Sequence, residues 1–312
     1  MQKRLGKFEA KLAQSEVDGI LVTGQNNIYY LTGFWGTEAT VFISGKRRLF
    51  VTDSRYTLIA KASVKGFDII ESRQALEEIA KIIKEDGLTK IGFDSQVTYG
   101  FYQGLSALFA DYQLVAMSNF IEDLRMIKDE TEIATIRRAC QISDQAFIDV
   151  LDIIKPGQTT EMDVNHFLDH RMRQLGAEGA SFEFIVASGY RSAMPHGRAS
   201  EKVIQTGETL TLDFGCYYNG YVSDMTRTVS VGQPHAELKK IYEIVLAAQL
   251  RVNAAAKAGM SGIEVDSVAR EYITEHGYGD AFGHSNGHGI GLEIHEGPNT
   301  SQKAGKVLVP GN

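Results

Sequence analysis

The spacing of apolar residues switches between helical and strand-like repeats over the first 120 residues of the chain. Apolar residues three or four apart predict amphipathic helices, whereas short apolar or alternating runs predict strands. Strands are expected at 18–23, 40–44, 48–52, 67–70, 90–93 and 113–116, and helices at 3–16, 74–86 and 99–110. Because strands and helices alternate, and the second and third strands are close enough to form a hairpin, the pattern predicts an α/β domain with a mixed sheet.

This first region holds few residues that could carry strong chemistry. They are Asp18, Asp53, Arg55, Asp68 and Asp94. They are scattered near the expected strand ends and have no partners in the sequence pattern, so we interpret them as solvated charges.

A second pattern begins after a boundary expected within 121–128. Asp129, followed three residues later by Glu132, is typical of a capping box at the start of a helix. This helix is expected to end at Pro156-Gly157. Its apolar face is expected to consist of Ile133, Ile136, Cys140, Phe147, Val150 and Ile154.

The order of elements in this second region is repeated. Lys155-Pro-Gly-Gln-Thr and Lys257-Ala-Gly-Met-Ser superimpose at an offset of 102 residues, and each lies between two predicted helices. Ser261 and Glu264 form a second capping box. The helix before the second corner is expected to use the apolar face Leu238, Ile241, Val245, Ala248 and Val252. The repetition predicts a pseudo-twofold α+β domain over 125–312, with a site between its halves.

The stretch 209–231 has the pattern of a β-hairpin around Asn219-Gly220, a dipeptide that favours a tight two-residue turn. This turn places Gly215 opposite Asp224 and puts Asp213 on the same face of the sheet. Two half-buried carboxylates on one face repel each other and are costly to desolvate. A bound cation removes both costs, so the hairpin predicts half of a metal site.

The segment 282–298 gathers three histidines, His284, His288 and His295, among five glycines. Glycine lets backbone and imidazoles crowd around a small ligand. Alternation over 289–294 predicts a strand there. His196, held between Pro195 and Gly197, is expected to join the same cleft.

Two other histidines, His166 and His170, have helical spacing, but they share their face with charged residues. We interpret them as solvated.

Composition limits the classes of function. A chain of 312 residues with 43% hydrophobic residues and a net charge of −7 is typical of a globular protein and argues against nucleic-acid binding. No apolar run is long enough for a membrane span, and the N-terminus lacks the apolar core of a signal peptide. Cys140 and Cys216 are expected to be reduced thiols in a cytoplasmic protein.

Three segments carry motifs whose order and spacing match a known family. They are Ala187-Ser-Gly-x-x-Ser-Ala-x-Pro-His-Gly197, Leu212-Asp-Phe-Gly215 with Ser223-Asp-Met-Thr-Arg227, and Gly287-His-Gly-Ile-Gly-Leu-x-x-His-Glu296. The chain resembles the pita-bread metallopeptidases, which form the methionine aminopeptidase/creatinase superfamily, and within them the Xaa-Pro aminopeptidases and Xaa-Pro dipeptidases (prolidases). The resemblance implies a creatinase-type N-terminal α/β domain over 1–124 and a pita-bread catalytic domain over 125–312.

The resemblance also implies a site with two divalent metal ions, for which Mn²⁺ is expected and Co²⁺ or Zn²⁺ are alternatives. Asp213, Asp224 and His288 are then metal ligands, with Asp224 bridging both ions. His196 and His295 are the expected catalytic residues, because they hydrogen-bond the substrate carbonyl and the tetrahedral oxyanion. His284 lines the pocket beside the scissile proline. The expected substrates are small proline-containing peptides, and the expected assembly is a homodimer.

The chain departs from the family pattern in one respect. Two further glutamate ligands are expected, the first shortly after a turn like Pro310-Gly311, yet the sequence ends at Asn312. This departure predicts a pita-bread domain truncated at its C-terminus, with weak or absent metal binding and no turnover.

Three alternatives remain open on sequence grounds. A methionine aminopeptidase-like enzyme shares the metal scaffold, but the N-terminal α/β domain and the segment around His196 argue against it. A creatinase-like amidinohydrolase does not use the metal ligands, which are intact here. A non-catalytic peptide-binding pita-bread protein is the third alternative.

Overall fold

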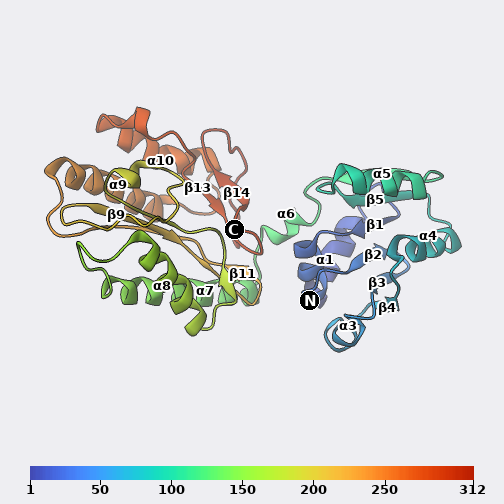
Figure 1. The fold of residues 1–312 in the computed structure, drawn as a ribbon. Helices are drawn as coiled ribbons and strands as arrows, with labels where there is room; N and C mark the ends of the chain where they lie inside the picture. Colours follow the sequence, from blue (N-terminus) through green and yellow to red (C-terminus); the bar gives the residue numbers. More distant parts are fainter. The chain divides into compact units, whose positions relative to one another are not determined.

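The computed structural model describes residues 1–312, which fold as two compact units, Met1–Arg125 and Met126–Asn312 (Figure 1). The sequence places the division after residue 124. None of the helices combines the length and the apolar character that crossing a membrane requires.

The N-terminal unit is built on a six-stranded sheet in the order β4-β3-β2-β1-β5-β6. β2 is antiparallel to both of its neighbours, and the remaining pairs are parallel, so the predicted mixed sheet is confirmed. The strands are β1 (Gly19–Val22), β2 (Thr40–Ser44), β3 (Arg48–Thr52), β4 (Asp68–Glu71), β5 (Lys90–Asp94) and β6 (Gln113–Met117).

The helices of this unit contribute apolar faces to its core. They are α1 (Gln2–Leu12), α2 (Gln25–Thr32), α3 (Thr57–Ser63), α4 (Ala75–Glu85), α5 (Tyr99–Leu108) and α6 (Glu122–Arg125). Ile79 and Ile83 of α4 and Leu105 of α5 are buried against Phe42 and Phe93 of the sheet.

Two of the charges interpreted as solvated are in fact buried, and that interpretation is wrong for Asp53 and Asp94. Asp94 accepts hydrogen bonds from the backbone N–H groups of Thr23 and Gly24, each at 2.8 Å. Burial raises the pKa of Asp94 above its usual value, and these hydrogen bonds oppose the rise. A carboxylate at a strand end can thus be buried when the loop after the neighbouring strand, here β1, supplies donors.

The C-terminal unit contains two three-stranded sheets, ordered β12-β9-β8 and β11-β10-β7, and a two-stranded ribbon, β13-β14. Its strands are β7 (Gly179–Ala180), β8 (Ile185–Ser188), β9 (Thr209–Phe214), β10 (Cys216–Tyr218), β11 (Tyr221–Val222), β12 (Met225–Ser230), β13 (Gly287–Gly289) and β14 (Glu296–Thr300). Its helices are α7 (Glu130–Leu151), α8 (Glu161–Gln174), α9 (Ala236–Ala255) and α10 (Gly262–Glu275), with short 3₁₀ turns η1 (Gly189–Ala193) and η2 (Gly279–Ala281).

The predicted repeat of helix, corner and helix is confirmed. The N–H of Gly157 donates to the carbonyl of Ile204 at 2.8 Å, and the N–H of Gly259 donates to that of Leu308 at 2.9 Å. Both glycines have left-handed φ values, 77° and 97°. The helices after the corners begin with capping boxes 101 residues apart, at Thr160 and Ser261, so the first corner is one residue longer than the second.

The two predicted apolar faces are only partly correct. The buried face of α7 is made by Ala139, Ile142, Ala146 and the expected Val150, while the expected Phe147 and Ile154 are only partly buried against the same core. On α9 the burial is confined to Ile244 and Ala248, whereas the expected Leu238 and Val245 are 41% and 51% exposed. Helices α7 and α8 cover one face of the sheet that contains β9 (Figure 1).

Candidate metal centre

The hairpin formed by β9–β10 and β11–β12 has the register that its turn predicts. Asn219 and Gly220 have φ values of 46° and 74°, the left-handed values of a tight hairpin turn. Tyr218 pairs with Tyr221 next to the turn, and Asp213 pairs with Thr226 further along. The same register puts Gly215 opposite Asp224, as predicted.

The hairpin changes sheets at this point. β9 and β12 belong to one sheet and β10 and β11 to the other, with Gly215 and Asp224 lying between the paired segments. A Cβ atom on Gly215 would lie 2.0 Å from the carbonyl oxygen of Ser223, so only glycine allows this close approach. The break leaves the Asp224 side chain at the junction of the two sheets.

Neither of the two hairpin carboxylates, Asp213 and Asp224, forms an ion pair with a Lys or Arg side chain. Asp213 accepts a hydrogen bond from the Thr226 hydroxyl at 2.8 Å, and Asp224 lies 3.5 Å from Nε2 of His288. Burial raises the pKa of Asp213, and the neighbouring Asp224 carboxylate raises it further. Burial also raises the pKa of Asp224, while His288 and His295 oppose the rise.

His288 lies on β13, and His295 directly precedes β14, so the ribbon brings the two imidazoles together. Their ring centroids are 4.3 Å apart. The expected strand over 289–294 is wrong, because residues 290–295 form the turn between β13 and β14. The alternating apolar residues there have a different role, since Leu292 is buried within a turn.

Glu296 closes this turn, a role that sequence reasoning missed. Its Oε1 accepts hydrogen bonds from the N–H groups of Leu292, at 2.9 Å, and Glu293, at 3.1 Å, while Oε2 lies 3.4 Å from Nζ of Lys128. A Cβ on Gly291 would lie 2.6 Å from the carboxylate. The only signal in the sequence is the glycine-rich stretch before it, because a turn there leaves buried backbone N–H groups such as that of Leu292 in need of an acceptor.

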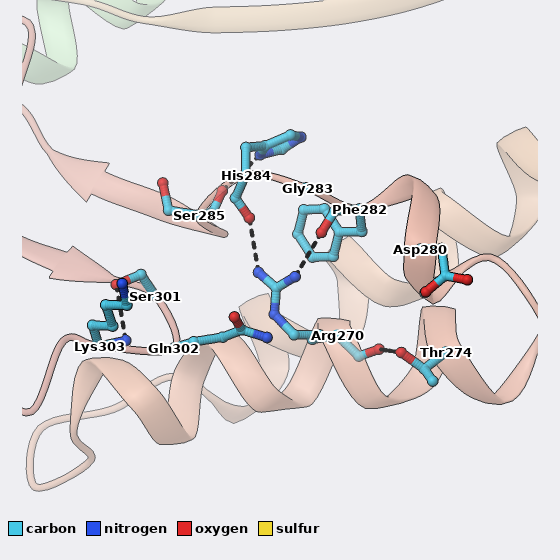
Figure 2. Close-up of a pocket in the computed structure, with 11 residues that line it drawn as sticks. Arg270, Thr274, Asp280, Phe282, Gly283, His284, Ser285, Ser301, Gln302 and Lys303 are labelled. Atoms are coloured by element: carbon cyan, nitrogen blue, oxygen red, sulfur yellow. Dashed lines mark hydrogen bonds between the residues drawn. The ribbon is translucent and has the colours of Figure 1, made fainter.

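The other two predicted site residues lie on loops. His196 is exposed in a turn after η1, close enough to Asp213 for its charge to lower the pKa of that carboxyl group. His284 lines a pocket of about 430 Å³ whose wall includes Arg270 and Lys303 (Figure 2). Its imidazole contacts the Ser285 carbonyl and the Phe282 ring rather than another predicted site residue.

Figure 2 also shows how this pocket is held. The Arg270 guanidinium donates to the carbonyls of Phe282 and His284, at 2.7 and 2.8 Å. It also pairs with the buried carboxylate of Asp266, which lies outside the view. These bonds fix the loop that precedes β13. His166 and His170 are exposed on α8, as interpreted from the sequence.

The donor set of the hairpin and ribbon fits a divalent cation in chemistry. Two half-buried carboxylates with raised pKa values and a neighbouring imidazole are oxygen and nitrogen ligands that suit Mn²⁺. No three His, Cys, Asp or Glu side chains are gathered closely enough to form a complete metal cluster. The structure therefore brings the candidate ligands together in pairs, Asp213 with Asp224 and Asp224 with His288.

Comparison with known proteins identifies both units. The model of the metallopeptidase family M24 matches residues 134–312, and that of the creatinase/prolidase N-terminal domain matches residues 4–127. The chain is 45% identical to an uncharacterized peptidase of Bacillus subtilis, over 99% of this chain and 88% of the relative. It is 36% identical to an Xaa-Pro dipeptidase of Pyrococcus horikoshii, over 100% of this chain and 88% of the relative.

Among solved structures, an Xaa-Pro dipeptidase from Bacillus anthracis superimposes with a TM-score of 0.96 and 46% identity, covering 99% of this chain and 87% of that chain. These matches run through both units. They give no support to the expected C-terminal truncation or to the expected loss of activity.

Proposed function

The chain belongs to the metallopeptidase family M24, as a metallo-exopeptidase close to the Xaa-Pro dipeptidases and aminopeptidases, and from this premise we propose that it hydrolyses the Xaa-Pro bond at the N-terminus of small proline-containing peptides. The observation that carries the proposal is that Asp224 has Asp213 as its neighbour on the hairpin and His288 as its neighbour from the ribbon. The hairpin register puts both carboxylates on one face, and His288 approaches Asp224 to 3.5 Å from a different element.

Family membership implies divalent metal ions, and we propose Mn²⁺ as their identity because the three residues offer mainly carboxylate oxygen. Asp213, Asp224 and His288 would hold the ions. When bound, the ions supply Lewis acidity and lower the pKa of water to near neutrality. Burial is the main cause of both raised carboxyl pKa values, and a bound cation would offset the cost of burying the two charges.

The remaining predicted residues act on the substrate. His196 and His295 can donate hydrogen bonds to an oxygen that gains negative charge as the carbonyl is attacked. His295 lies beside His288, and His196 faces the Asp213 side of the site. His284 lines a pocket whose shape would select the proline ring, because a proline amide offers no N–H to recognise.

The direct test is hydrolysis of Ala-Pro and Ala-Pro-Ala by the 312-residue chain with Mn²⁺, beside Met-Ala-Ser as the substrate of the methionine aminopeptidase alternative. We expect turnover of the proline peptides alone. Because even the outer partners of metal ligands are typically worth about 10–100-fold, Asp224→Asn should lower kcat/KM by more than about 100-fold.

Asp169→Asn is the matched control, since Asp169 is an exposed carboxylate on α8 that pairs with Arg173. It should leave activity unchanged. Turnover of Met-Ala-Ser but not of the proline peptides would support the methionine aminopeptidase alternative. Absence of both Mn²⁺ binding and turnover would support the binding-protein alternative.

A further inference from the structure

The proposed catalytic residue His196 lies on a loop with little regular structure. This segment, residues 189–200, is named here the His196 loop; it follows β8 and begins with η1. Short turns hold its backbone: the N–H of Met194 donates to the carbonyl of Arg191 at 2.9 Å, and that of Gly197 donates to Met194 at 3.1 Å. An exposed histidine can act on a substrate carbonyl efficiently only when such a loop keeps one conformation.

A single buried carboxylate, Glu161 at the first position of α8, ties the two ends of the His196 loop together. The side chain of Glu161 is fully buried. Its Oε1 accepts from the N–H and hydroxyl of Ser188, at 2.7 and 2.9 Å. Its Oε2 accepts from the N–H and hydroxyl of Ser200, at 3.2 and 2.7 Å. Because both ends bond the same group, Glu161 fixes the distance between them.

Arg191 links this carboxylate to the far side of the loop. Its Nε donates to Oε2 of Glu161 at 2.9 Å, and its Nη2 donates to the carbonyl of Arg198 at 2.6 Å. The guanidinium thus spans from the buried carboxylate to the residue two positions after His196. A planar fork can make both bonds at once, whereas a lysine ammonium is a flexible point charge.

Neighbouring Lys202 does not duplicate this role. Its Nζ lies 2.8 and 2.7 Å from the two carboxylate oxygens of Glu208, and it donates to the Ser188 hydroxyl at 2.8 Å. Arg191 is therefore the cation that pairs with Glu161, with side-chain exposures of 19% and 0%.

We propose that Glu161 and Arg191 are positioning residues for catalysis: they hold the His196 loop so that the imidazole of His196 meets the substrate carbonyl. This inference rests on the proposed function for its kinetic consequence. It goes beyond that function because neither residue touches the metal ligands or the substrate pocket. Their effect on the reaction must pass through His196.

The first experiment compares Arg191→Gln, Arg191→Lys and the wild type on Ala-Pro with Mn²⁺. Misplacement by about 1 Å can cost about 10²-fold in rate, so Arg191→Gln should lower kcat by roughly 10–100-fold with less than about threefold change in KM. Arg191→Lys, which keeps the charge but not the fork, should fall between the two. Mn²⁺ affinity should not change.

Arg171→Gln is the matched control, because it makes the same substitution in the same unit at another arginine that pairs with a carboxylate, that of Asp149. It should leave kcat within about twofold of the wild type. An Arg191→Gln enzyme that is no slower than this control overturns the inference.

The second experiment is a double-mutant cycle with His196→Ala. If Arg191 acts through His196, adding Arg191→Gln to His196→Ala should lower kcat by less than about twofold further. Losses that multiply would show that Arg191 acts on stability or on another residue, and would overturn the inference. If Arg191→Gln does not fold, the pair Glu161→Gln/Arg191→Gln, which removes the buried charge with its partner, takes its place in both experiments.

Hydrogen exchange followed by mass spectrometry separates failure of this inference from failure of the proposed function. Peptides covering 189–200 should lose protection in Arg191→Gln but not in Arg171→Gln, whether or not the enzyme turns over proline peptides. If the wild type shows no turnover but Arg191→Gln loses protection over 189–200, the proposed function is contradicted and the anchoring of the loop is not. Unchanged protection in Arg191→Gln contradicts the positioning role.

Discussion

The two repeats of the C-terminal unit, α7–corner–α8 and α9–corner–α10, make the same turn and are buried to very different extents. Each corner has a left-handed glycine whose N–H donates to a backbone carbonyl distant in sequence, that of Ile204 or Leu308, and each second helix begins with a capping box. The first repeat packs into the large core around β8, β9 and β12, while the second contributes Ile244, Ala248, Ala269 and Ile273 to a small cluster.

The repeats also differ at the first residue of the second helix. The first repeat has Glu161 there, which the structure places in a ring of donors from Ser188, Arg191 and Ser200. The second has Gly262, where a Cβ would lie 2.2 Å from the carbonyl oxygen of Asn299. One position therefore supports a loop in one half and admits a strand in the other.

This difference shows that the conformation of the corner does not determine which segment packs against the helix that follows it. The capping residues set the geometry in both halves, because hydroxyl and carboxylate side chains satisfy the free N–H groups of a helix start. What packs against the helix start then depends on one side chain. Substitutions can test the separation, and the following predictions run from the largest expected effect to the smallest.

Truncating a leucine side chain in each repeat should give the largest difference in unfolding free energy between the two repeats. Leu168→Ala on α8 removes a fully buried side chain and should cost about 3 kcal/mol of unfolding free energy. Leu250→Ala on α9, at 56% exposure, should cost less than about 0.5 kcal/mol. Urea unfolding followed by far-UV circular dichroism measures both.

Fluorescence of Trp35, the only tryptophan, reports on the N-terminal unit and provides the internal control. Its transition should move in neither variant. Equal losses from Leu168→Ala and Leu250→Ala would mean that the second repeat is as well packed as the first.

Adding a methyl group at the first residue of α10 should have the next largest effect on stability. Gly262→Ala places Cβ against backbone oxygens of Asn299 and Ala304, which cannot swing away, and should cost about 2 kcal/mol. Gly305→Ala is the control, because no atom lies within 4 Å of its Cβ position. The same urea transitions measure them, and equal stability of the two variants contradicts the close approach.

Removing either capping hydroxyl should have the same, smaller effect. Thr160→Ala and Ser261→Ala each delete a side chain that accepts from a backbone N–H, at 3.0 and 3.2 Å, and each should cost about 1 kcal/mol. A cost confined to one repeat would show that the two corners are not equivalent.

The smallest expected effect is the loss, in acid, of the stability that the capping-box carboxylates give to both repeats. Backbone hydrogen bonds from Thr160 and Ser261 lower the pKa of Asp163 and Glu264 below their usual values. Groups with depressed pKa stabilise the fold above their unfolded pKa, and this stability is lost as pH falls through the folded pKa. The urea midpoints of Asp163→Asn and Glu264→Gln should therefore lie below that of the wild type at pH 7 and approach it near pH 3. A gap that widens in acid contradicts this sign.

Sequence patterns predicted the local geometry well where turn chemistry decides it. Asn219-Gly220 set the hairpin register, and Ser261 with Glu264 marked a helix start, because these residues act on their own backbone. The patterns failed where distant segments decide. Ala139 and Ala146 are buried because their small side chains let α7 approach the sheet, and Glu296 converts an alternating run into a turn.

The candidate site divides in the same way. The placement of Asp213 and Asp224 on one face was predictable from one hairpin, whereas the contact between Asp224 and His288 depends on how a ribbon from the second half is placed. The anchoring of the His196 loop by Glu161 was not predictable, because Glu161 lies outside the motifs and only one of its partners, Ser188, is at a specified motif position.

The hairpin that changes sheets at Gly215 has a consequence for the order of folding. Contacts between residues close in sequence form quickly, because closing a short loop costs little chain entropy. Asp213 and Asp224 are joined by such a hairpin, whereas His288 is drawn from a segment made much later in the chain. During synthesis, we expect the two carboxylates to meet before His288 leaves the ribosome, so the growing chain first presents an acidic hairpin and gains the imidazole of the candidate site afterwards.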